Sequence, residues 1–93
     1  MEKIILQNHT YQLIHNVKDG FDMEAVLEKV TDYYEPFDYI VGDWAYGKLR
    51  LKGFYKEENP SVKKYNNIKN LEEYIEKNCA YECKWFCLEK EKN

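Results

Sequence analysis

A short run of strict alternation between apolar and basic residues limits most strongly what this chain can fold into. In residues 48–53, KLRLKG, leucine and glycine occupy one set of alternate positions and cations occupy the other. Successive side chains of a β-strand point to opposite faces, so this pattern predicts a strand with one apolar and one basic face. The preceding run, YIVGDWAYG, is typical of a strand that ends in a turn. Residues 37–56 are therefore expected to form a β-hairpin.

The rest of the chain predicts three further strands and two helices. Two β-prone runs with a turn between them indicate a hairpin within residues 3–17, and a last strand is expected over residues 80–90. The carboxylate of Asp22 can cap the first turn of a helix whose pattern ends before Pro36. A second helix, with capping-box spacing at its start, is expected from Asn70. The resulting order is ββαββαβ.

This order predicts a small α+β fold. The chain has 93 residues, too few to give each of two domains its own core, so a single domain is expected over residues 1–93, with a frayed tail at about 90–93. Strands joined by short turns favour a mostly antiparallel sheet, and both helices are expected to pack on one face of it.

Composition and charge narrow the functional classes. The net charge is -3 and the pI is near 5.4, so the whole molecule has no long-range attraction to nucleic acid. The sequence has no signal-peptide pattern and no apolar run of ~18 residues, so we expect a cytoplasmic protein without membrane contact. An odd number of cysteines, three, favours reduced thiols over a secreted disulfide framework. A monomer or weak dimer is expected.

The predicted hairpin carries the best candidate for a binding surface. Its cations share one strand face and are flanked by aromatic residues. Such a set can follow a phosphate backbone and stack bases, although a solvated sheet face with cation stems lying over aromatic rings gives the same pattern. The candidate partner-binding residues are Asp43, Trp44, Tyr46, Lys48, Arg50 and Lys52.

Asp43 and the cysteines are the candidates for chemistry. An aspartate between glycines most often accepts hydrogen bonds from turn amides, and local spacing places no second carboxylate or histidine beside Asp43. Cys79 and Cys83 lack the Cys-X-X-Cys spacing of redox pairs, and Cys87 alone does not complete a zinc site. Buried, reduced cysteines and no metal or cofactor are therefore expected. A small enzyme, or a metal- or redox-dependent regulator using Asp43 and this pair, is the alternative.

Three segments resemble one known family. DYIVGDWAYGKLRLKGF at residues 38–54 is similar to the signature hairpin of the YutD-like proteins, a small bacterial family also described as a domain of unknown function. The resemblance continues in LEEYIEKNCAYECKWFCLEK at residues 71–90 and in KDGFDMEAVL at residues 18–27. It implies a small α+β domain of the bacterial cytosol, and it brings no activity, substrate or catalytic residue.

The expected function is that of a non-enzymatic cytoplasmic binding or adaptor module. Its 43–52 hairpin face would contact RNA or an acidic protein surface, since cations and aromatic rings are concentrated there in an otherwise acidic chain.

Overall fold

Two hairpins and a last strand form a five-stranded antiparallel sheet in the computed structural model, which describes residues 2–78 and 83–91. The order across the sheet is β1-β2-β5-β3-β4, so β5 lies at the centre between the two hairpins, and β1 and β4 are the edges. The predicted α+β class and antiparallel sheet are confirmed. The strands are β1 (Glu2–Leu6), β2 (His9–Val17), β3 (Tyr39–Ala45), β4 (Lys48–Phe54) and β5 (Trp85–Lys90).

Two short α-helices and three 3-10 turns connect the strands. As predicted, Asp22 caps the first helix, because its carboxylate accepts a hydrogen bond from the amide of Ala25 at 3.2 Å. Asn70 ends the last 3-10 turn, and its side chain donates to the carbonyl of Lys64 rather than forming the predicted capping box. The helices are α1 (Met23–Lys29) and α2 (Leu71–Asn78), and the 3-10 turns are η1 (Asp32–Tyr34), η2 (Lys64–Asn66) and η3 (Ile68–Asn70). None of the helices in the described ranges is long and apolar enough to cross a membrane.

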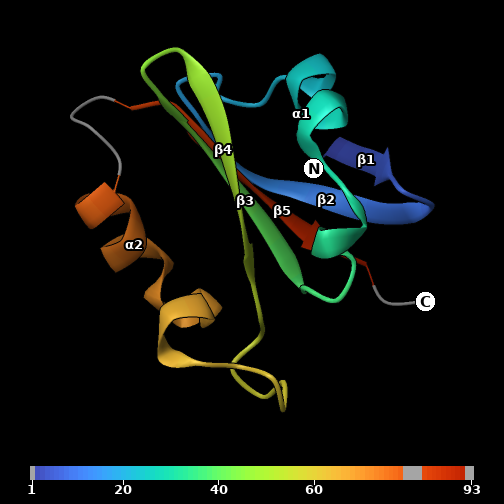
Figure 1. The fold of residues 1–93 in the computed structure, drawn as a ribbon, viewed down its shortest axis with the longest axis vertical. Coiled ribbons are helices and arrows are strands. Elements are labelled where there is room, and N and C mark those ends of the chain that lie inside the picture. The colour runs from blue at the N-terminus through green and yellow to red at the C-terminus, as the bar shows by residue number, and fades with distance from the viewer. Residues whose placement is uncertain (1, 79–82, 92–93) are drawn as a thin grey trace.

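The two helices cover opposite faces of the sheet, which corrects the prediction that both pack on one face (Figure 1). Ile40 of β3 belongs to the cluster that packs under Val26 of α1. Its neighbour Val41 belongs to the cluster under Leu71 of α2. Because successive strand residues point to opposite faces, a central strand with two consecutive buried apolar residues needs cover on both sides.

The β3–β4 hairpin is closed by a two-residue turn. Tyr46 and Gly47 are its two central residues, and both have positive φ angles, of 55° and 75°, as in the two-residue turns that suit twisted hairpins. Gly42 lies within β3 instead, where an added Cβ would lie 2.2 Å from the ring of Phe86. Of the residues between the two glycines, Asp43, Trp44 and Ala45 therefore belong to β3, and Tyr46 belongs to the turn.

Candidate functional site

Asp43 and Arg50 form an ion pair across the hairpin. They are opposite each other in the register of β3 and β4, with Arg50 Nε 3.1 Å from Asp43 Oδ1 and Nη2 2.7 Å from Oδ2. Arg50 Nη2 also donates to the carbonyl oxygen of Asn78 at 2.7 Å, at the end of α2. The hydrogen bonds that Arg50 donates to Asp43 raise the pKa of the Arg50 guanidinium. The bidentate ion pair, with the bond to Asn78, links both strands of the hairpin to α2. The prediction that Asp43 accepts hydrogen bonds from turn amides is therefore wrong.

Lys52 extends into a cluster of aromatic rings on the same face. Its Nζ lies 5.4, 5.3 and 5.6 Å from the ring centroids of Phe54, Tyr65 and Tyr74. Burial, and next the charge of Asp43, raises the pKa of the Tyr74 hydroxyl. At this distance the ammonium is attracted to the ring faces. Of the two explanations of the basic strand face, a cation whose stem lies over aromatic rings therefore applies to Lys52. Lys48, at the start of β4, is exposed.

The structure separates the two aromatic candidates from this face. Trp44 packs against the cluster on the α1 side, and its Nε1 donates to the carbonyl oxygen of Gly20 at 2.7 Å. Tyr46 is fully exposed at the tip of the hairpin. Of the six candidate residues, the structure thus brings Asp43 and Arg50 into contact and places Lys52 and the exposed Lys48 on the same strand face. Trp44 and Tyr46 lie on different surfaces.

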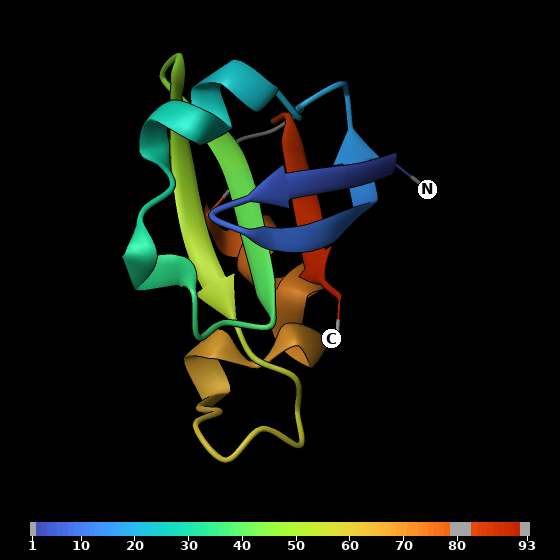
Figure 2. The ribbon, with the colours of Figure 1, turned by 90° about the vertical axis from the view of Figure 1, so that its right-hand side faces the viewer.

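A groove along the outer edge of β4 is a further functional candidate, and sequence reasoning identified only Arg50 and Lys52 of its lining. It has a volume of about 700 Å³, and residues 50–53 of β4 form part of its lining. Figure 2 shows β4 at the side of the sheet, with the segment after α1 passing beside it. Tyr33, Tyr34 and Phe37 of that segment line the groove together with Tyr65 and Tyr74 from the other side of the strand. The abundance of tyrosine was the only signal in the sequence.

The aromatic lining of the groove is both ordered and accessible. The ring centroid of Tyr33 lies 5.0 Å from that of Tyr34 and 5.6 Å from that of Phe37, so these rings pack as one group. Tyr33 and Tyr65 are nevertheless 67% and 66% exposed. Phe37 lies over Gly53, where an added Cβ would be 2.2 Å from the ring, so this ring approaches the strand backbone closely where there is no side chain.

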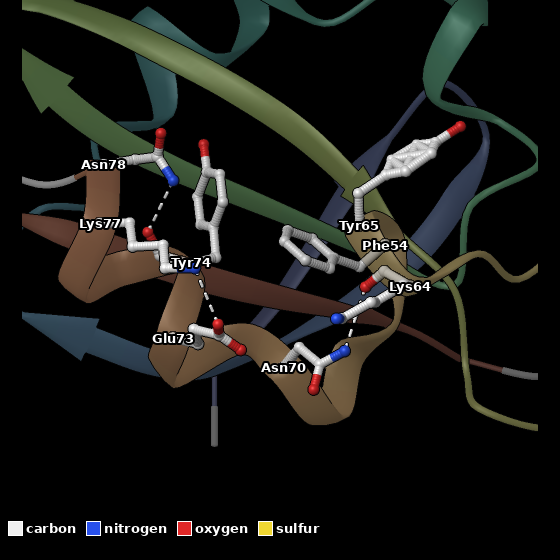
Figure 3. Close-up of a pocket in the computed structure, with 8 residues that line it drawn as sticks. All are labelled: Phe54, Lys64, Tyr65, Asn70, Glu73, Tyr74, Lys77 and Asn78. Carbon is white, nitrogen blue, oxygen red and sulfur yellow. Dashed lines mark hydrogen bonds and ion pairs between the residues drawn. The ribbon is translucent and has the colours of Figure 1, made fainter.

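A smaller pocket adjoins the groove between α2 and η2. It has a volume of about 340 Å³ and shares the rings of Tyr65 and Tyr74 with the groove (Figure 3). Its rim carries the ion pair between Lys77 and Glu73, at 2.9 Å, which lies on the exposed side of α2. Asp43 lines neither concavity, so its carboxylate does not reach the space in which a ligand would bind.

The cysteines do not converge on a reaction centre in the described part of the chain. Cys87 is buried in the core, and burial raises the pKa of its thiol to about 12, so it is not a reactive thiolate at neutral pH. Cys83 takes part in a disulfide bond, so the expectation of a reduced thiol is wrong for this residue. Cys79 lies outside the described residues. Within residues 2–78 and 83–91, no three His, Cys, Asp or Glu side chains are grouped to hold a metal ion.

Comparison with known proteins places the fold and sequence in one family. A family model described as "Putative antitoxin YutD-like" matches residues 5–89. The chain belongs to the YutD-like family. The resemblance seen in the hairpin is thereby confirmed over nearly the whole chain.

A relative and a solved structure, both named YutD and both from Bacillus subtilis, support this family. The protein named "Putative antitoxin YutD" of Bacillus subtilis (strain 168) is 44% identical over 87 residues, which cover 94% of this chain and 96% of that protein. The solution NMR structure of protein yutD from B. subtilis has a TM-score of 0.83 with 41% identity, and the match covers 100% of this chain and 84% of that one.

Proposed function

We propose that this protein is a cytoplasmic, non-enzymatic antitoxin that binds a partner protein in the groove along β4. The family description and the name of the B. subtilis relative both contain the word antitoxin. An antitoxin that neutralises a toxin by binding to it needs a contact surface rather than a reaction centre. The groove along β4 offers such a surface, while Asp43 is buried against Arg50 away from both concavities.

The observation that carries this proposal is the aromatic groove itself. Tyrosine supplies a large apolar ring with a polar end, which is why it is enriched at protein interfaces and among the residues that dominate binding energy. Here Tyr33 and Tyr65 stand largely exposed on the two sides of one groove of about 700 Å³. Exposed rings held in place by their neighbours lose little conformational freedom when a partner binds.

A protein partner fits the charges of this surface better than RNA. Arg50 is paired with Asp43, and the ammonium of Lys52 lies over the rings of its own chain. Two of the three cations of β4 are therefore engaged within the protein, and the chain as a whole carries a net charge of -3. Binding to RNA gains most of its free energy from cations that are free to neutralise phosphates.

Photo-crosslinking in cells tests both the surface and the class of partner. A benzophenone amino acid replaces Tyr33 or Tyr65 in the groove, and Ile5 serves as the control because it is 67% exposed on β1, at the far edge of the sheet. We expect a discrete protein adduct from both groove positions that survives ribonuclease and is absent from the Ile5 variant. An adduct that ribonuclease removes, equal adducts from Ile5, or no adduct at all would refute binding of a protein in the groove.

Growth after depletion tests the antitoxin role separately. Cells depleted of the protein should stop growing, and the wild-type chain should restore growth. The variant Tyr65→Glu should fail to restore it, while Ile5→Glu, which adds the same charge to an equally exposed site, should succeed. Unchanged growth of depleted cells would contradict the antitoxin role even if a partner is captured.

A further inference from the structure

We infer that the segment of the partner that enters the groove is an extended acidic strand, which adds to the free edge of β4 as a sixth strand of the sheet. This inference rests on the proposed function for the identity of the surface, and it adds the mode of binding and the chemistry of the ligand. Its evidence is the direction of the β4 backbone groups, a pairing that the chain already makes beside β4, and the charges of the groove.

The backbone groups of Leu49, Leu51 and Gly53 point away from the sheet. In β3 the amide of Trp44 donates to the carbonyl of Lys84 on the β5 side, so its neighbour Asp43 directs its backbone groups to β4. The partner of Asp43 in β4 is Arg50, and alternation then turns the groups of Leu49, Leu51 and Gly53 outward. These outward positions recur about every 7 Å along the edge, the spacing that an added strand requires.

The outward groups are nearly free to bind. In the described part of the chain, a single hydrogen bond reaches them, from the hydroxyl of Tyr34 to the carbonyl oxygen of Leu51 at 3.5 Å. Hydrogen bonds from a hydroxyl are usually about 2.7–2.8 Å long, so this contact is weak and an incoming amide can displace it. The edge therefore presents a row of backbone donors and acceptors within a groove that aromatic rings line.

The chain already adds a short strand beside β4 immediately beyond the groove. The amide of Tyr55 donates to Asn66 at 2.7 Å, and the amide of Ile68 donates to the carbonyl oxygen of Tyr55 at 2.9 Å. These two bonds form a parallel bridge between Tyr55 and Asn67. The backbone after β4 is thus paired by the chain itself, and the groove opens where that pairing stops, so a partner strand would continue an existing row of hydrogen bonds.

The charges of the edge favour an acidic strand over a second copy of β4. The lining of the groove contains Arg50, Lys52 and Lys63 and no carboxylate. Two copies of β4 paired edge to edge would bring cations opposite cations, an arrangement that destabilises strand pairs and protects sheet edges from self-association. Acidic side chains on one face of an added strand would avoid this repulsion and could reach Lys63 and the half-exposed guanidinium of Arg50, which keeps its bond to Asp43. Apolar side chains on the other face of that strand could contact Tyr33 and Phe37.

Synthetic peptides test this mode of binding on the whole chain. The probes are three nine-residue peptides that alternate glutamate with valine, lysine with valine, or glutamate with proline, added to isotope-labelled protein and followed by NMR. We expect the glutamate–valine peptide alone to slow hydrogen exchange at the amides of Leu49, Leu51 and Gly53 and to give cross-strand contacts with β4. The glutamate–proline peptide carries the same charge but should pair poorly as a strand, because proline has no amide hydrogen and its ring fixes the φ angle at every second residue.

A pair of lysines gives a matched test of the charge. Lys63 lines the groove, whereas its exposed neighbour Lys64 lines the smaller pocket instead. Lys63→Glu should weaken binding of the glutamate–valine peptide about fivefold, or about 1 kcal/mol, and Lys64→Glu should weaken it less. Equal effects of the two variants would refute an acidic strand in the groove.

Further outcomes test strand addition and separate it from the proposed function. Equal binding of the glutamate–proline peptide, protection of other amides only, or no binding of any peptide would overturn strand addition. Contacts between two β4 strands in the protein alone would show that a second copy covers the edge, and would overturn it as well. A cross-linked partner in cells without protection of the three amides leaves the antitoxin proposal standing, whereas peptide binding without a cross-linked partner supports strand addition and refutes the proposed function.

Discussion

The ion pair between Asp43 and Arg50 should make unequal contributions to stability when either partner is removed. The Asp43 side chain is 2% exposed, whereas that of Arg50 is 46% exposed. Among the described residues, Arg50 supplies the only hydrogen bonds that the Asp43 carboxylate accepts. Loss of Arg50 therefore leaves a buried charge without a partner, whereas loss of the Asp43 charge leaves a guanidinium that water can reach.

The magnitudes follow from this difference in exposure. Arg50→Met should lower the free energy of unfolding by about 3–5 kcal/mol, the usual effect of leaving one partner of a buried pair uncompensated. Asp43→Asn keeps a side-chain oxygen for Arg50 and leaves its bond to Asn78, so it should lower the free energy of unfolding by only about 1–2 kcal/mol. A domain of this size has about 5–15 kcal/mol in total, so the first change removes a large fraction of the stability.

Urea denaturation followed by tryptophan fluorescence measures all three variants. The double variant Asp43→Asn with Arg50→Met removes both charges, so it should be no less stable than Arg50→Met alone, which gives a coupling energy of about 1–3 kcal/mol. If Arg50→Met destabilises the protein no more than Asp43→Asn does, or if the two effects simply add, the buried carboxylate is not the reason for the pairing.

Two other features of the structure give direct predictions. Gly53→Ala would place a methyl group 2.2 Å from the Phe37 ring, so the thermal midpoint should fall by an amount equivalent to about 1–3 kcal/mol and recover in part with Phe37→Leu, and a wild-type midpoint would disprove the close packing. Burial and a hydrogen bond to Glu89 raise the pKa of Tyr39 from 10.0 to about 12, so its contribution to stability is complete below about pH 10 and is lost as the pH rises through about 12. The urea midpoint should therefore fall over this range and fall less in Tyr39→Phe, and equal slopes for the two proteins would contradict this origin.

Several residues of the candidate site were identified from local pattern alone, but their roles were not. Alternation correctly placed Lys48, Arg50 and Lys52 on one face of a strand, because the side-chain period of two is a local property. Whether that face meets solvent, a carboxylate or aromatic rings depends on β3 and α2, which the chain brings there from other parts of the sequence. The pairing of Arg50 with Asp43 depends on the register of the hairpin, which the turn at Tyr46 and Gly47 sets. Alternation within one strand does not reveal that register.

The groove escaped prediction for a similar reason. Its aromatic residues come from the segment after α1, from Tyr55 just after β4, and from η2 and α2, and the first of these segments is far from the others in sequence. They become the sides of one groove because β4 lies at the edge of the sheet. Edge position is a property of the order of strands, and that order results from pairing between residues far apart in the chain.

By itself, the sequence determined the class of the fold, the strands and the helices, since periodicity, capping residues and turn residues act over a few neighbours. The runs of consecutive apolar residues in β3 and β5 also required cover on both faces, and the prediction that both helices pack on one face overlooked this. The insertion of β5 between the hairpins, the free edge of β4, and the groove and smaller pocket beside it depend on tertiary packing. Those outcomes depend on the packing of distant segments against one another, which minimises the exposed apolar surface of the whole molecule and not of any one segment.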